Sequence, residues 1–161
     1  MPMEHSNDSS DRAGSVKARK PANNDRAVAY TGVVTYLAGQ AYDIWWHAKN
    51  VSLVPELPQR LLLIHLGIYV GAALCLAAGL MLLRRTGGMV AGLLLVAGGA
   101  VQLAGFFLDM WEHGHGRSVD LYHNMLWYGF IVAVAGVVRM EASLERPVDA
   151  PRYRATSTDH G

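Results

Sequence analysis

The fold is decided by the stretch from Phe107 to His123, FLDMWEHGHGRSVDLYH. It ends one long apolar run and begins the next, and it places Asp109, His113, His115 and His123 between segments that carry almost nothing ionisable. An earlier stretch has the same character: AYDIWWH, residues 41–47, ends an apolar run, and His65 lies near the start of the next. Two hairpins of apolar segments are therefore indicated, each with polar groups close to its connection.

Composition places the chain among membrane proteins. Its 161 residues are 52% hydrophobic and 17% charged, and this length indicates one domain. The charges gather in the first 26 residues, in short loops and after Arg139, whereas a soluble domain spreads them along every amphipathic element. The net charge of +1, with no basic stripe interleaved with aromatic residues, gives no sign of a nucleic-acid partner.

Four apolar runs each approach the ~20 residues that a helix needs to cross a bilayer. They predict an all-α, integral membrane four-helix bundle, with helices at about 28–47, 61–83, 88–110 and 120–140. This four-helix transmembrane domain covers 27–141. It lies between a disordered cytoplasmic tail over 1–26 and a flexible C-terminal tail over 142–161. Small residues recur within the runs, which favours close helix packing.

The distribution of lysine and arginine predicts the orientation. These residues concentrate before residue 27, at positions 84–85 and after residue 138, while the other two loops carry few. Positive residues remain on the cytoplasmic side, so we expect both termini there and the two polar hairpins outside. The chain is predicted to be a multi-pass protein of the cell's inner (plasma) membrane, with the lipid bilayer as its main partner.

The two halves of the chain share a pattern of polar residues. Each has an aspartate, a histidine four residues later and a second histidine near the start of the following helix. These residues are Asp43, His47 and His65 in the first half and Asp109, His113 and His123 in the second. Both halves run in the same direction through the membrane, so the pattern predicts a parallel two-helix repeat about an axis along the membrane normal.

The six residues are candidate metal ligands. A four-residue step places two side chains on one helix face, so all six are expected in one layer below the outer surface. Each ionisable group at membrane depth costs about 2.5 kcal/mol or more on insertion scales, and a bound metal would offset that cost. Copper, zinc and non-haem iron all accept this ligand set. The outer location and the lack of cysteine ligands favour copper. Hydrogen-bonded pairs at helix ends are the simpler alternative.

The Asp-x3-His and later His pattern resembles the membrane site of one family. The copper-dependent membrane monooxygenases, which oxidise methane and ammonia, have an aspartate, a histidine four residues on and a histidine on the next helix. Asp43, His47 and His65 match this pattern, and so does the second set. The resemblance covers only these residues, and this chain is much shorter than the family's subunits. It implies copper and oxygenase chemistry.

These observations predict an integral membrane metal-binding protein with an Asp/His site at the extracytoplasmic face. The site would serve redox or oxygenase chemistry, or belong to a subunit of a membrane oxidase complex or a homo-oligomer. No catalytic residue is assigned, and whether the chain is itself an enzyme stays open.

Three alternatives remain. One is a haem b electron carrier, with His47 and His123 or His65 and His113 as axial ligands. Another is a non-enzymatic accessory subunit, whose tails dock partners and whose polar layer only holds the helices together. The third is a proton-coupled transporter that uses the two aspartates as relays.

Overall fold

The computed structural model describes residues 23–50, 58–85, 87–117 and 119–144. The helices are α1 (Asn23–Asn50), α2 (Pro58–Ile64), α3 (Leu66–Leu83), α4 (Met89–Gly114) and α5 (Asp120–Leu144). No strand occurs in these four ranges, and the all-α prediction is confirmed. α1 begins and α5 ends inside the stretches assigned to tails, and the rest of both predicted tails, 1–22 and 145–161, lies outside the described residues.

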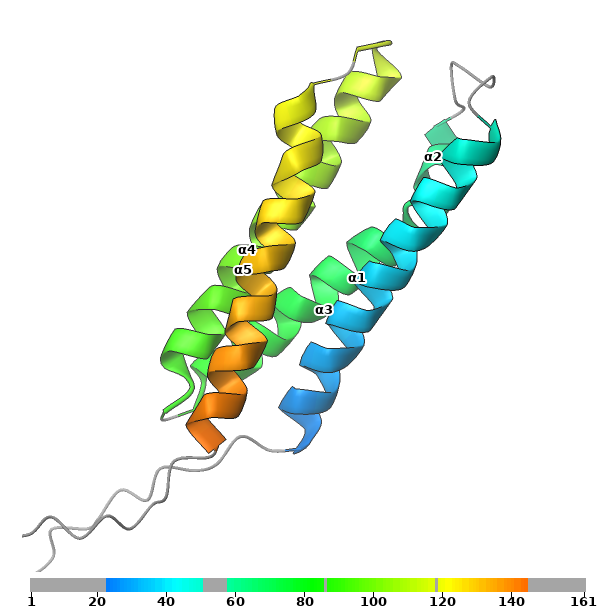
Figure 1. The fold of residues 1–161 in the computed structure, drawn as a ribbon. Helices are drawn as coiled ribbons and strands as arrows, with labels where there is room; N and C mark the ends of the chain where they lie inside the picture. Colours follow the sequence, from blue (N-terminus) through cyan, green and yellow to red (C-terminus); the bar gives the residue numbers. More distant parts are fainter. Residues whose placement is uncertain (1–22, 51–57, 86, 118, 145–161) are drawn as a thin grey trace, which may run out of the picture.

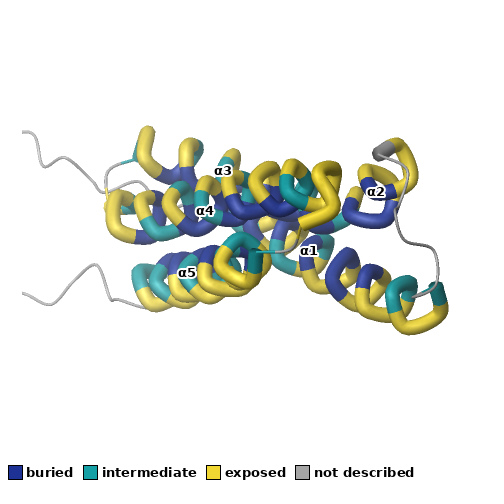
Figure 2. Tube along the Cα trace, turned by 90° about the horizontal axis from the view of Figure 1, so that it is seen from above, coloured by how far each residue is buried: buried dark blue, intermediate teal, exposed yellow. Residues whose placement is uncertain are grey.

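The helices form a bundle of two antiparallel pairs. α1 packs against α3, α4 packs against α5, and α3 packs against α4, whereas α1 makes few contacts with α5. Figure 1 shows the start of α1 and the end of α5 at the same end of the bundle, and the two pairs separating toward the other end. In Figure 2 the buried residues of the helices face the inside of the bundle.

Three of the helices, α3, α4 and α5, are long and apolar enough to cross a membrane, with 18, 26 and 25 residues. These three helices indicate a multi-pass membrane protein. The remaining predicted span, 28–47, corresponds to α1, which has 28 residues but a less apolar composition. Its polar residues include the buried Asp25, Gln40 and Asp43.

The structure differs from the continuous helix predicted over 61–83, because the helix is interrupted at His65 between α2 and α3. The Leu61 carbonyl accepts the His65 backbone N–H at 3.2 Å and also lies 2.8 Å from His65 Nδ1. The Ile68 N–H reaches the His65 carbonyl at 2.9 Å, which is the three-residue step of a tighter 3₁₀ turn. The imidazole and the backbone thus share one carbonyl at the interruption.

Glycine permits close approach within each helix pair. A Cβ added to Gly39 in α1 would lie 2.5 Å from the Gly67 carbonyl carbon in α3. In the other pair, a Cβ on Gly98 would lie 2.5 Å from the Ala133 backbone nitrogen. Membrane helices associate through such small-residue contacts because lipid supplies no hydrophobic force between them.

We expect Gly39→Ala to lower the stability of the purified protein by about 1–3 kcal/mol, because the added methyl group overpacks the α1–α3 crossing. Thermal unfolding in detergent measures this effect. Gly114→Ala is the matched control, because nothing lies within 4 Å of a Cβ at Gly114. An unchanged unfolding midpoint for Gly39→Ala would contradict the close crossing.

Tyr36 connects α1 to α5 in the middle of the bundle. Its side chain is fully buried, its hydroxyl donates to the Leu126 carbonyl at 2.8 Å, and its ring stacks on Phe130 at 4.7 Å between centroids. Gln40 Nε2 donates to the same hydroxyl at 3.0 Å. These contacts hold α1 against α5 two turns before Asp43.

Two ion pairs hold the other end of α1. Asp25 is fully buried, and its Oδ2 lies 2.6 Å from Nε of Arg85, which follows α3. Arg26 makes a two-point contact with Glu141 of α5, with N–O distances of 2.9 and 2.8 Å. These pairs explain why α1 begins in a polar stretch, since its first turn is fixed by tertiary partners.

Candidate metal centre

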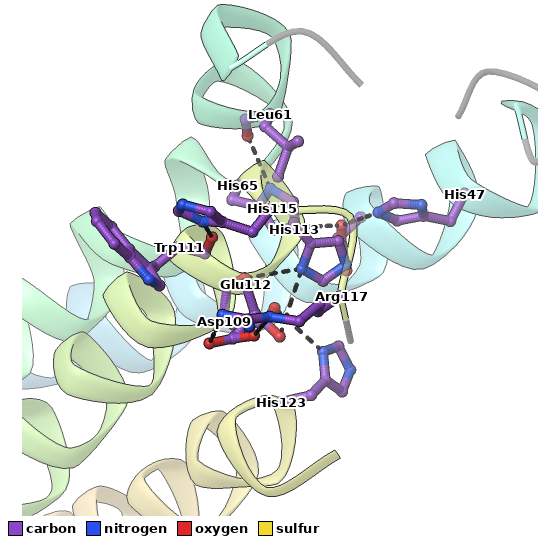
Figure 3. A network of polar contacts seen from close by, with 11 residues as sticks. His47, Leu61, His65, Asp109, Trp111, Glu112, His113, His115, Arg117 and His123 are labelled. Atoms are coloured by element: carbon purple, nitrogen blue, oxygen red, sulfur yellow. Dashed lines mark hydrogen bonds and ion pairs between the residues drawn. The ribbon is translucent and has the colours of Figure 1, made fainter. Parts of the chain in front are cut away.

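One cavity of about 560 Å³ lies at the end of the bundle away from the start of α1, and it collects the polar residues of both halves. It is lined by Asp43, His47, His65, Asp109, His113, Asp120, His123 and Asn124. Figure 3 shows His47, His113 and His123 approaching this region from three different helices. The six residues selected from the sequence therefore share a single cavity, as their spacing suggested, while their role as ligands stays a prediction.

The first set is compact. Asp43 is buried on α1, His47 lies one turn further along the same helix, and His65 comes from the interruption between α2 and α3. Asp43 Oδ1 lies 3.1 Å from His47 Nε2 and 3.0 Å from His65 Nε2. One ligand atom from each of the three residues lies within 4.8 Å of the other two, so the group could hold a metal ion.

The hydrogen bonding of His65 indicates that a cation, either a proton or a metal ion, lies between its ring and Asp43. A carbonyl can only accept, so the 2.8 Å contact with Leu61 places a proton on His65 Nδ1. In the neutral ring, Nε2 then presents a lone pair toward Asp43 Oδ1, and two acceptors at 3.0 Å repel each other. A cation relieves this repulsion, either a second proton on His65 or a metal ion. Histidine ligands of metals characteristically donate their other ring N–H to a carbonyl.

The spacing of the ligand atoms also fits a metal. Metal–nitrogen and metal–oxygen bonds are about 2.0–2.2 Å long in zinc sites, so neighbouring ligand atoms lie about 3.3 Å apart in a tetrahedron. The separations of 3.0 and 3.1 Å around Asp43 Oδ1 are near this value, and they are also the length of an ordinary N–H···O hydrogen bond. In the part of the chain that the structure describes, Asp43 Oδ1 is buried and has no hydrogen-bond partner of acceptable geometry.

The second set is more open. Asp109 Oδ1 lies 3.6 Å from His113 Nδ1, and Asp109 Oδ2 lies 3.7 Å from His123 Nδ1. His113 Nδ1 also lies 2.9 Å from the Asp109 backbone carbonyl. Across residues 23–50, 58–85, 87–117 and 119–144, only the first set brings three ligand atoms within 4.8 Å of one another. The two sets are thus unequal in this structure.

The two sets nevertheless line the same cavity. Asp43 also contacts a histidine from a separate helical segment in addition to the histidine one turn along α1. The first set is therefore more than a hydrogen-bonded pair within one helix.

The sequence interpretation missed three participants. Asp120 and Asn124 are not among the six predicted ligands, yet both line the cavity. Their four-residue spacing on α5 was the available signal, because it places them on one helix face. The contact between His65 and the Leu61 carbonyl has no sequence signal of its own, since His113 makes the same four-residue contact with the Asp109 carbonyl inside α4. His115 is exposed, and its Nδ1 lies 2.7 Å from the Trp111 carbonyl oxygen.

No family model matches this chain, and neither curated proteins nor solved structures give a match. The resemblance to the copper-dependent monooxygenases therefore remains one of ligand pattern. Fold and site together define a multi-pass helical membrane protein with a buried Asp43, His47 and His65 group that could hold a metal.

Proposed function

We propose that this protein is an integral membrane metal-binding protein whose Asp/His cavity holds a transition metal at the extracytoplasmic face. The observation that carries the proposal is the convergence of two imidazole nitrogens on the buried Asp43 Oδ1, at 3.1 and 3.0 Å. A metal ion would balance the charge of the carboxylate and accept the imidazole lone pairs.

Asp43, His47 and His65 would form the primary centre. Three protein ligands leave at least one coordination position for water or a substrate, which is typical of catalytic rather than structural metal sites. The cavity of about 560 Å³ gives room for such a ligand and for a second ion held by the other half. The second centre would comprise Asp109, His113 and His123.

Nitrogen and oxygen ligands without thiolate suit copper, iron or zinc. We favour copper on the resemblance of the Asp-x3-His and later His pattern to the copper-dependent membrane monooxygenases and on the proposed outer location of the site. The cavity lining among the described residues contains no cysteine. With copper or iron the centre would support redox or oxygenase chemistry, within this chain or as part of a membrane oxidase complex. With zinc it would not be redox-active.

The membrane arrangement is part of the proposal. We infer that α1 crosses the bilayer as a fourth span, held by its packing against α3. Its exposed residues Val34 and Ile44 suit a lipid-facing surface. The arginines near the α3–α4 turn and the end of α5 would mark the cytoplasmic side of the plasma membrane. The cavity would then open to the outside.

Glycine contacts support the internal repeat. Gly32 approaches the backbone of Gly71 and Cys75, and Gly98 approaches that of Gly129 and Ala133. The first-helix positions differ by 66 residues, as Asp43 and Asp109 do, and the second-helix positions differ by 58, as His65 and His123 do. The same offsets thus relate both the packing contacts and the ligands. The second set would be a copy of the first at the same depth.

Haem b receives less support from this geometry. Nε2 of His47 and Nε2 of His65 both lie close to a carboxylate oxygen, whereas an axial haem ligand directs its nitrogen to the iron. Absorption spectroscopy separates the two proposals directly, because a bound haem gives an intense Soret band.

Metal analysis tests the proposal. We expect the full chain, purified in detergent with its affinity tag removed, to contain one or two transition-metal ions per chain and no Soret band. Elemental analysis by mass spectrometry measures the content, and paramagnetic resonance identifies copper or iron. A protein without stoichiometric metal, both as isolated and after incubation with copper, iron and zinc, would refute the proposal.

A further inference from the structure

The opposite end of the bundle contains a second cavity, of about 580 Å³. Its polar lining consists of Arg84, Arg85, Arg139 and Ser143, contributed by the end of α3 and by α5. The first turn of α4 completes the lining. Three arginines thus line one space, although like charges repel.

The nearby carboxylates do not balance these arginines. Asp25 pairs with Arg85, and Glu141 pairs with Arg26. Among the described residues, Arg84 has no carboxylate partner, and Arg139 contacts only the Ser143 hydroxyl, at 3.2 Å from Nη1. Within residues 23–50, 58–85, 87–117 and 119–144, the four arginines and two acids at this end therefore leave two positive charges without a carboxylate partner.

The surroundings of the cavity are apolar. Met89 and Val90 line it and are 63% and 48% exposed, and Leu93 continues the exposed strip one turn along α4 at 52%. α3 and α4 are two of the helices that are apolar enough to cross a membrane, and the cavity lies at the turn between them. A ligand here meets cationic groups at one end and an apolar helix surface at the other.

We propose that this cavity binds the phosphate headgroup of an anionic phospholipid, with the acyl chains lying along the exposed face of α4. Arginine suits this role because its planar guanidinium donates two parallel hydrogen bonds to phosphate oxygens. The Ser143 hydroxyl positions Arg139, since it donates to the Arg139 carbonyl at 2.8 Å and accepts from its guanidinium. The phosphate would supply the missing negative charge. This proposal does not depend on the metal centre.

Native mass spectrometry of the detergent-purified full chain tests the proposal, with phosphatidylglycerol and phosphatidylcholine titrated in parallel. We expect tighter binding of phosphatidylglycerol. Each arginine contributes about 1 kcal/mol to attraction of anionic lipid, so Arg84→Gln together with Arg139→Gln should weaken it about thirty-fold. Arg117→Gln is the matched control, because Arg117 follows the opposite end of α4, does not line this cavity and pairs with Glu112.

Three results would overturn the proposal. They are equal affinity for the two lipids, an equal loss in Arg117→Gln, and complete displacement of phosphatidylglycerol by millimolar inorganic phosphate, which would indicate a small-anion site instead. If the double variant does not fold, Arg84→Gln alone carries the test, because Arg84 is exposed and forms no ion pair among the described residues. Its expected effect is about five-fold.

Discussion

Asp43→Asn should remove about one metal ion per chain from the purified protein and weaken metal binding at least a hundred-fold. The amide has no charge to balance the cation and is a poor metal ligand. Changes to residues that only support a ligand already cost about 10–100-fold in affinity, so loss of the central carboxylate should cost more. Competition with a chelator of known affinity, followed by elemental analysis, measures the loss.

Asp120→Asn is the matched control for this variant. It makes the same chemical change in the same cavity, but Asp120 is exposed at the start of α5 and lies outside the compact ligand group. We expect near-normal metal content in Asp120→Asn. Loss of metal in this control together with retention in Asp43→Asn would contradict the assigned centre.

The same variant separates a metal from a proton as the cation between Asp43 and His65. If His65 is doubly protonated and simply pairs with Asp43, then Asp43→Asn should alter stability without changing metal content. Asp109→Asn extends the comparison to the other half. A further loss of one ion in Asp109→Asn would indicate two separate centres, whereas no loss would assign the metal to the first half alone.

The largest expected effect on stability lies at the other end of α1. Asp25→Ala should lower the free energy of unfolding by about 3 kcal/mol, because it leaves Arg85 without a counter-charge beside a fully buried position. The expected loss lies at the lower end of the about 3–5 kcal/mol typical of a broken buried ion pair, since the Arg85 side chain is 29% exposed and is partly screened by solvent. Thermal or denaturant unfolding in detergent measures the change.

Glu141→Gln is the control for the Asp25 variant. It breaks the other ion pair of α1, whose side chains are 41% and 28% exposed, and partly exposed pairs contribute about 1 kcal/mol or less. Asp25→Ala with Arg85→Ala should recover part of the loss, because both charges are then removed. Equal destabilisation by Asp25→Ala and Glu141→Gln would show that the burial of Asp25 adds nothing to the free energy lost when its ion pair is broken. Metal content should stay unchanged in all three variants.

The existence of the helices could be predicted because each long apolar run has about the length that a membrane-spanning helix needs. The start of α1 could not, since the residues around Asp25 and Arg26 are polar and resemble a tail. Their helical state accompanies ion pairs with Arg85 and Glu141, which lie 60 and 115 residues away in the sequence. No local pattern contains that information.

The candidate site could be predicted in outline for a similar reason. The four-residue steps and the hairpins were enough to bring six side chains to one cavity. The inequality of the two sets was not predictable, because it lies only in the distances between side chains, 3.0 and 3.1 Å around Asp43 Oδ1 but 3.6 and 3.7 Å around the Asp109 carboxylate. Residues 61–66 are apolar apart from His65 and contain neither glycine nor proline. The helix interruption at His65 therefore has no local signal in the sequence either.

The position of Tyr36 has a consequence for how a metal ion would enter and leave the proposed site. The Tyr36 ring and hydroxyl lie between α1 and α5, two turns along α1 from Asp43, and the hydroxyl is already engaged by Leu126 and Gln40. An ion that enters the Asp/His cavity would be blocked by the Tyr36 side chain and would have to leave by the route through which it entered. Loading and release would then be one-sided events, which suits a resident cofactor better than a permeating cargo.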